Sequence, residues 1–287
     1  MSDAGIGDFP DAANPILGTS GLIAVDIGNT NVKALCRSAD GRWQRQVAML
    51  REEGWPDRIV DWAIAHAAQR ETLRWRVAAV HRGAVDRLEA AVRCRTRAVE
   101  SDAAPNPSGV GNFRRVVAAD LEFGIAVDSP DRVGIDRLVG AWEAFRETRR
   151  GVVVVDAGSA ITVDLVDDAG AFSGGAILPG IRMQAAALAS GTDALPLVGP
   201  WEGEPPPGPG KNTEQAIRLG VMTAASATID RLVLRYQTHL HTRASPPVVI
   251  TGGDAPLLRN WLETETRLRR DLVCSGLLRL PLADPTE

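Results

Sequence analysis

Several polar residues between Asp26 and Lys33 have the types and spacing needed to bind a phosphate chain with its metal ion. They follow a short apolar run that predicts a buried strand ending in a tight turn. Gly28 lets the backbone approach a ligand closely, and Asn29 and Thr30 offer amide and hydroxyl groups. Asp26 could hold a cation and Lys33 adds a positive charge. Together these groups suit a triphosphate with its magnesium ion.

An ordinary hairpin turn is the structural alternative, because Asp-x-Gly-Asn also builds such turns. The second half of the chain repeats the pattern, since the apolar run 152–155 ends in Asp156, Gly158 and Ser159. Each copy continues as a strand, an acidic glycine turn and a returning strand. The repeat favours a duplicated domain whose two turns grip a polyphosphate from both sides.

A third candidate is the pair Asp136 and Arg137, at the start of an amphipathic helix predicted over 135–149. Asp136 could simply stabilise the helix dipole, and Arg137 could be solvated. The same pair suits phosphoryl transfer to an alcohol, because a carboxylate can accept the hydroxyl proton while a guanidinium binds an anionic substrate group.

The elements that must position these residues form an α/β pattern. Residues 22–50 predict an antiparallel meander, and the region rich in proline and glycine at 199–211 predicts a loop. We expect a loop also at 101–115, and a tail after the last helix. Further strands are predicted at 75–80, 152–155, 161–166, 171–177 and 248–250, and helices at 56–70, 84–92, 135–149, 181–190, 256–262 and from Thr213, which is expected to cap its helix.

Composition narrows the function classes. The chain has 287 residues and a formal net charge of -4, which gives no general attraction to nucleic acid or to an anionic membrane. Its three cysteines have no zinc-like spacing, and buried or inert thiols in a reducing compartment are expected. Residues 1–20 lack the features of a signal peptide, and no apolar run has the length of a membrane span. We expect a cytoplasmic protein with a loose N-terminal tail.

The ordered set of motifs resembles the type III pantothenate kinases, within the acetate kinase, sugar kinase, Hsp70 and actin superfamily. The similarity covers about residues 21–255. The segments that carry it are 26–33 (DIGNTNVK), 134–137 (GIDR), 156–162 (DAGSAIT), 174–180 (GGAILPG), 213–220 and 251–254 (TGGD).

This resemblance implies two ribonuclease H-like domains with a nucleotide cleft between them, at 21–133 and 134–287, after the tail 1–20. It implies ATP-dependent phosphorylation of pantothenate to 4'-phosphopantothenate, the first step of coenzyme A biosynthesis. Such enzymes use Mg2+ and a monovalent cation, K+ or NH4+, and are typically homodimers.

The resemblance also implies roles for individual residues. Asp136 would be the general base, Asp26 would lie near magnesium, and Asp156 would bind the monovalent cation. The ATP-binding residues would be Asp26, Ile27, Gly28, Asn29, Thr30, Asn31, Val32, Lys33 and Ser159. The pantothenate-binding residues would be Gly134, Ile135, Asp136, Arg137 and Thr213.

The sequence departs from the family near the acceptor site. Relatives usually have alanine at Ile135, threonine at Ser159 and a tyrosine at Val127. One alternative is therefore a phosphotransferase of the same fold acting on another small acid or polyol. Another is a non-catalytic nucleotide-binding regulator, against which the retention of Asp136 speaks because a binding-only protein needs no base.

Overall fold

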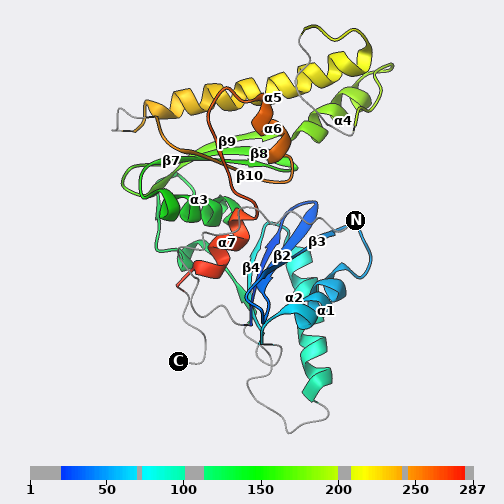
Figure 1. Ribbon diagram of the computed structural model, residues 1–287, viewed down its shortest axis with the longest axis vertical. Coiled ribbons are helices and arrows are strands. Elements are labelled where there is room, and N and C mark those ends of the chain that lie inside the picture. Colours follow the sequence, from blue (N-terminus) through cyan, green and yellow to red (C-terminus); the bar gives the residue numbers. More distant parts are fainter. Residues whose placement is uncertain (1–20, 70–72, 101–112, 200–207, 241–244, 282–287) are drawn as a thin grey trace. The chain divides into compact units, whose positions relative to one another are not determined.

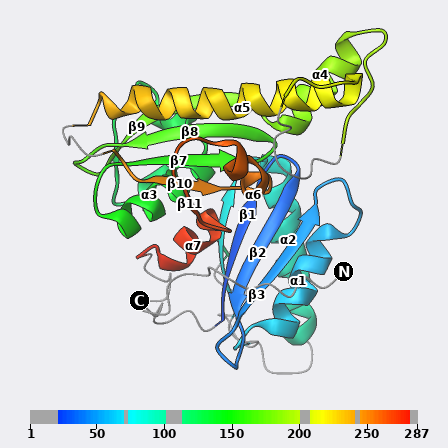
Figure 2. The same ribbon diagram turned by 45° about the horizontal axis from the view of Figure 1, so that its top comes forward.

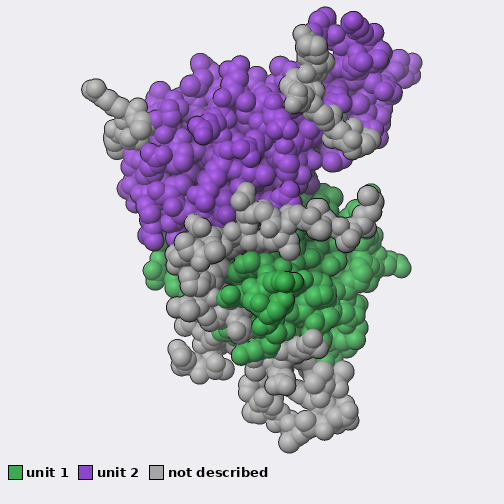
Figure 3. Space-filling model, in the orientation of Figure 1, with its two compact units in different colours: residues 1–122, 131–143, 271–287 green, residues 123–130, 144–270 purple. Residues whose placement is uncertain are grey.

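The computed structural model describes residues 21–69, 73–100, 113–199, 208–240 and 245–281 (Figure 1). The chain divides into two compact units, coloured separately in Figure 3. Unit 1 comprises residues 1–122, 131–143 and 271–287, and unit 2 comprises residues 123–130 and 144–270. The predicted tail 1–20 and most of the predicted loop 101–115 lie outside the described residues, as do residues 200–207 of the loop 199–211.

Unit 1 is built on a five-stranded sheet in the order β3-β2-β1-β4-β5. Strand β1 pairs antiparallel with β2 and parallel with β4, so the predicted opening meander is confirmed. The short strand β5 occupies the end of the region predicted as a loop. The bounds are β1 (Leu22–Ile27), β2 (Asn31–Arg37), β3 (Trp43–Met49), β4 (Arg74–Ala79) and β5 (Phe113–Arg115).

Helices cover both faces of this sheet. On one face, alternate β1 residues such as Ile23 and Val25 pack in a buried cluster with Trp55 and Leu88, from α1 (Trp55–His66) and α2 (Arg82–Glu100). Because successive side chains of a strand point to opposite faces, Asp26 faces the other side. There lies α7 (Leu272–Arg279), as Figure 1 shows.

Unit 2 contains a six-stranded sheet in the order β11-β10-β7-β8-β9-β6. From β9 to β11 it repeats the order of β3 to β5, with antiparallel, antiparallel, parallel and parallel pairings. The predicted internal repeat is therefore confirmed. The bounds are β6 (Gly124–Ile125), β7 (Val152–Ala157), β8 (Ala160–Val166), β9 (Ala171–Pro179), β10 (Val248–Thr251) and β11 (Arg267–Leu268).

A long helix, α5 (Thr213–Gln237), runs along one face of this sheet (Figure 2), beside α4 (Ile181–Gly191) and α6 (Ala255–Leu258). The helix cap predicted at Thr213 is wrong by one residue. Asn212 is the N-cap, because its side chain accepts a hydrogen bond from the Gln215 amide, and Thr213 is the first helical residue. Short 3-10 turns lie at η1 (Ala118–Asp120), η2 (Pro130–Arg132) and η3 (Arg259–Trp261).

The compact units do not follow the predicted boundary between residues 133 and 134. Helix α3 (Ile135–Thr148) belongs to unit 1 up to Glu143 and to unit 2 beyond it. Its first part packs against α7, where the Glu143 carboxylate accepts a hydrogen bond from Arg279 and is fully buried. The tail predicted after residue 262 is wrong, because α7 is a buried helix that returns to unit 1.

Candidate functional site

The β1–β2 hairpin of unit 1 places the first predicted motif. Asp26 and Lys33 are directly opposite each other in the antiparallel register, with Lys33 Nζ 3.5 Å from Asp26 Oδ2. The turn between them closes with a 3.0 Å hydrogen bond from the Gly28 amide to the Asn31 carbonyl oxygen. Residues 29–31 are exposed. These exposed residues lie beside the Lys33 ammonium and the Asp26 carboxylate.

The carboxylate of Asp26 lies in a strongly desolvated position, since the residue is only 7% exposed. Burial raises its pKa above the usual range, Lys33 opposes the rise, and the nearby carboxylates of Asp136 and Asp271 add to it. Unit 1 by itself therefore brings the predicted base, Asp136, within electrostatic reach of the hairpin predicted to bind phosphate. A bound cation would relieve the mutual repulsion of these acids.

Asp136 occupies the first turn of α3, where its Oδ1 accepts a 2.8 Å hydrogen bond from the Arg137 amide. The carboxylate folds back over Gly134. A β-carbon at residue 134 would lie 2.5 Å from Asp136 Oδ1, which is closer than real contacts allow. A glycine at this position therefore lets the carboxylate adopt its place. Ile135 and Arg137 are half-buried beside it.

The structure adds two residues that sequence reasoning missed. Asp271 immediately precedes α7, with a left-handed backbone at φ 51°, and its carboxylate accepts a 2.7 Å hydrogen bond from Arg45 Nε of β3. A local signal existed, because an aspartate followed by an apolar run is a plausible helix start. The pairing with Arg45 had no local signal, since 226 residues separate the two.

The second Asp-x-Gly turn lies in unit 2. Asp156 of β7 is opposite Thr162 of β8, and the Gly158 amide donates a 3.0 Å hydrogen bond to the Ala160 carbonyl. Ser159, at the tip of this turn, is exposed. The hairpin thus repeats the arrangement of the first one, with Asp156 in the place of Asp26 and a threonine in the place of Lys33.

Residues after β10 pack against this turn. Gly252 has φ 103°, and a β-carbon there would lie 2.3 Å from the Ala157 carbonyl oxygen, so the position requires glycine. The Asp254 amide donates a 2.9 Å hydrogen bond to the same oxygen. Burial raises the pKa of the Asp254 carboxyl, and Arg182, whose Nη2 lies 3.3 Å from Oδ1, opposes the rise. The TGGD segment and the start of α4 therefore border the Asp156 turn.

The predicted pantothenate-binding residues fall in different units. Gly134, Ile135, Asp136 and Arg137 are in unit 1, whereas Thr213 is exposed at the start of α5 in unit 2. Val127, the position of the missing tyrosine, is also in unit 2, where its Cγ1 would lie 3.5 Å from a β-carbon at Gly174.

The described residues contain no group of three or more histidine, cysteine, aspartate or glutamate side chains arranged to hold a metal ion by themselves. Magnesium in nucleotide sites needs fewer protein ligands, because phosphate oxygens and water complete its shell and one or two carboxylates suffice. The buried carboxylate of Asp26 and the half-buried, mutually repelling carboxylate of Asp136 fit that requirement.

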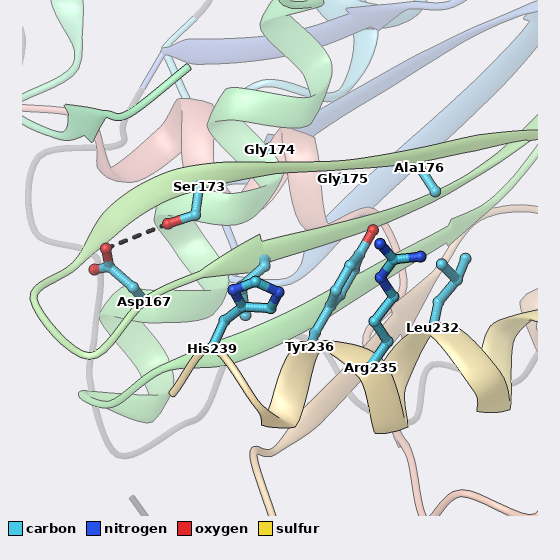
Figure 4. A pocket seen from close by; sticks show the side chains of 10 residues that line it. Asp167, Ser173, Gly174, Gly175, Ala176, Leu232, Arg235, Tyr236 and His239 are labelled. Carbon is cyan, nitrogen blue, oxygen red and sulfur yellow. Dashed lines mark hydrogen bonds between the residues drawn. The ribbon is translucent and has the colours of Figure 1, made fainter. Parts of the chain in front are cut away.

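A cavity of about 530 Å³ lies elsewhere in unit 2, between the β8–β9 hairpin and the end of α5 (Figure 4). It is lined by Arg235, Tyr236 and His239, and at its edge Ser173 Oγ donates a 3.2 Å hydrogen bond to Asp167. It lies at the opposite end of β8 from Ser159 and is lined by none of the predicted site residues. In the part of the chain that the structure describes, no helix is long and apolar enough to cross a membrane.

Comparisons with known proteins identify the same family as the order of the motifs. The sequence profile of type III pantothenate kinases matches residues 22–235. A type III pantothenate kinase of Rhodopirellula baltica is 35% identical over 91% of this chain and 98% of its own. One of Rubrobacter xylanophilus is 37% identical over 56% of this chain and 62% of its own. A crystal structure of a Baf family protein from Campylobacter jejuni, described as a transcriptional activator, has a TM-score of 0.54 at 19% identity, covering 90% of this chain and 96% of that one. The structural likeness supports the fold alone.

Proposed function

The chain belongs to the type III pantothenate kinase family, and from this premise we propose that it transfers the γ-phosphoryl group of ATP to the primary hydroxyl of pantothenate. The product is 4'-phosphopantothenate, in the first step of coenzyme A biosynthesis. One observation within unit 1 carries the proposal: Asp136 lies within electrostatic reach of the Asp26–Lys33 hairpin. The proximity of these two groups supports the proposed pairing of a base with a phosphate-binding turn.

The hairpin of unit 1 holds the phosphate chain. Lys33 pairs with phosphate oxygens, to which the exposed residues 29–31 donate hydrogen bonds. Asp26 would hold the magnesium ion, which neutralises charge on the phosphoryl group during transfer. Catalysis in this reaction class is mostly positioning and electrostatic stabilisation, and a buried, fixed carboxylate and cation supply both.

Asp136 acts as the general base. The hydroxyl oxygen of pantothenate forms a bond to the γ-phosphorus as the bond from that phosphorus to the β,γ-bridging oxygen breaks, and the hydroxyl proton passes to the Asp136 carboxylate. The neighbouring guanidinium of Arg137 binds the carboxylate of pantothenate. Gly134 and Ile135 form the wall beside them, as the resemblance implies.

Unit 2 contributes the second hairpin to this proposal. Ser159 would donate to a phosphate oxygen, and Asp156 would bind the monovalent cation, K+ or NH4+. A homodimer in the cytoplasm, with Thr213 reaching pantothenate, belongs to the same proposal and rests on the family resemblance.

A second candidate keeps the chemistry and changes the acceptor. Val127 supplies an apolar side chain where relatives usually have a tyrosine, and it lies beside Gly174, which adds no side chain of its own. Residue 127 therefore offers no phenol hydroxyl to a substrate. Another small hydroxy acid or polyol would be the acceptor in that case.

The test is an assay of the purified full chain with ATP, Mg2+ and pantothenate, with and without K+, and with other small hydroxy acids and polyols in competition. We expect K+-dependent formation of 4'-phosphopantothenate. We expect the variant Asp136→Asn to bind ATP with nearly unchanged affinity and to lose turnover. Transfer to another alcohol in preference to pantothenate would favour the second candidate, and ATP binding without transfer to any alcohol would indicate a nucleotide-binding regulator.

A further inference from the structure

Helix α7 is attached at both ends to the sheet face that carries Asp26. At its start, the Cys274 thiol lies 3.7 Å from the Lys33 carbonyl oxygen, and the preceding Asp271 accepts a hydrogen bond from Arg45. At its end, Arg76 Nη1 donates to the carbonyl oxygens of Leu277 and Leu280, at 3.0 and 2.8 Å. The helix thereby forms a fixed backing for the phosphate-binding hairpin.

The cations Lys33 and Arg45 share this face with the carboxylates of Asp26 and Asp271, and the carboxylate of Asp136 also acts on Asp26. Lys33 and Arg45 lie on neighbouring strands, where Lys33 pairs with Val47 and Arg45 is two residues away on the same side. Asp26 and Asp271 are close enough that each disfavours charge on the same thiol, that of Cys274. The carboxylates of Asp26 and Asp271 are therefore each stabilised by a cation on this face.

The two observed ion pairs differ in the distance between nitrogen and oxygen. Arg45 Nε is 2.7 Å from Asp271 Oδ2, whereas Lys33 Nζ is 3.5 Å from Asp26 Oδ2. The Asp271 side chain is 4% exposed, so its carboxylate depends on a cationic partner. Arg45 is 46% exposed and reaches it from the outer strand. The looser Lys33 contact is the one that a phosphate can replace.

We propose that Asp271 and Arg45 form a positioning pair for nucleotide binding: Arg45 binds Asp271 and so keeps that carboxylate from drawing Lys33 away from the phosphate chain. The inference rests on the proposed function to the extent that the ligand is ATP. Asp271 lies beyond residue 235, where the match to the family profile ends.

This arrangement predicts the direction in which the loss of each residue changes the affinity for ATP. Without Arg45, the buried Asp271 carboxylate attracts Lys33 and competes with the phosphate chain for it. Without Asp271, Arg45 remains half-exposed and solvated, and one repelling charge near Asp26 is gone. Loss of the cation therefore weakens ATP binding, loss of the carboxylate does not, and loss of both restores binding.

The experiment is a double-mutant cycle on the full chain, with the Kd for Mg–ATP measured by calorimetry and Tm measured alongside. We expect Arg45→Gln to weaken binding about tenfold, and Asp271→Asn and the double variant to stay within about threefold of wild type. Asparagine tolerates the left-handed backbone of residue 271. Arg45→Lys should restore the affinity, and Arg42→Gln, which removes an exposed cation in the same hairpin, should change little.

Equal weakening by both single variants with an additive double variant would overturn the inference. So would lowered Tm with unchanged ATP affinity, which is the signature of a purely structural ion pair. Because the cycle needs no acceptor, it is independent of the pantothenate assay. A protein that binds ATP and phosphorylates nothing contradicts the proposed function alone, while a wild-type protein that does not bind ATP contradicts both.

Discussion

A β-carbon added to Gly134 would lie 2.5 Å from Oδ1 of Asp136. Because the clash is with the end of a short side chain, we expect Gly134→Ala to fold with a loss of less than about 1 kcal/mol, as the carboxylate rotates away. The base is then misplaced, and kcat should fall by one to two orders of magnitude, roughly the effect of a 1 Å displacement in an active site. Steady-state kinetics and urea unfolding would measure the two effects.

The matched control is Gly191→Ala, at the end of α4, where an added β-carbon meets nothing within 4 Å. It should leave both kcat and stability nearly unchanged. If Gly134→Ala kept full turnover, the carboxylate position seen here would not be the catalytic one.

The acidic neighbours of Asp26 make the unfolding free energy of the unliganded protein depend on pH. The pKa of Asp26 is raised by burial and by Asp136 and Asp271, so the folded chain holds this proton more tightly than the unfolded chain, whose pKa is about 3.9. The stabilising contribution is therefore complete below the unfolded pKa and is lost as pH rises through the folded pKa. Between about pH 4, near the unfolded pKa, and about pH 8, wild type should lose more unfolding free energy than Asp26→Asn.

Urea unfolding without nucleotide, at both pH values, measures this difference. Asp254→Asn is a useful comparison, because burial also raises the pKa of that carboxyl in unit 2 while Arg182 opposes the rise. An identical pH dependence of wild type and Asp26→Asn would mean that Asp26 ionises as freely in the fold as in the unfolded chain.

The part of the site that lies close together in sequence was predictable. The hairpin at 26–33 and its repeat at Asp156 showed themselves as apolar runs ending in Asp-x-Gly, because a strand and its turn are specified locally. The placement of Asp136 at a helix start was visible for the same reason. The roles given to these residues came from the order of the motifs along the whole chain.

Long-range packing could not be predicted. Helix α7 is eight residues long and its first seven are buried, so its sequence has no exposed polar face that would show a helical period. Its partners on the sheet lie more than two hundred residues earlier, as the Arg45–Asp271 pair shows. Because of this packing, residues 135–143 and 271–287 belong to unit 1. No feature of the sequence near residue 133 indicates this.

Arg76 should be important for stability through the end of α7. Its guanidinium satisfies the carbonyl oxygens of Leu277 and Leu280, which have no helical partner at a helix end. Arg76→Met should cost about 2 kcal/mol, because hydrogen bonds from a charged donor are lost and carbonyls are left buried. Arg58→Met is the control, since the Arg58 pair with Glu52 is exposed and should contribute less than about 1 kcal/mol. Equal losses in urea unfolding would show that α7 does not depend on Arg76.

The reactivity of the cysteine thiols tests the packing of α7 against the sheet. Of the three cysteines, Cys94 is exposed, whereas Cys36 and Cys274 are buried. Burial raises the pKa of Cys36 to about 12 and that of Cys274 well above its usual value, and the charges of Asp26 and Asp271 add to the second shift. At about pH 8, one thiol of the native protein should therefore react rapidly with an aromatic disulfide reagent, which releases one equivalent of its coloured thiolate. The unfolded protein, in which all three thiols are accessible, should release three equivalents. Cys94→Ser should abolish the rapid phase. Rapid labelling of Cys274 in that variant would mean that α7 opens from the sheet, and with it the backing of Lys33.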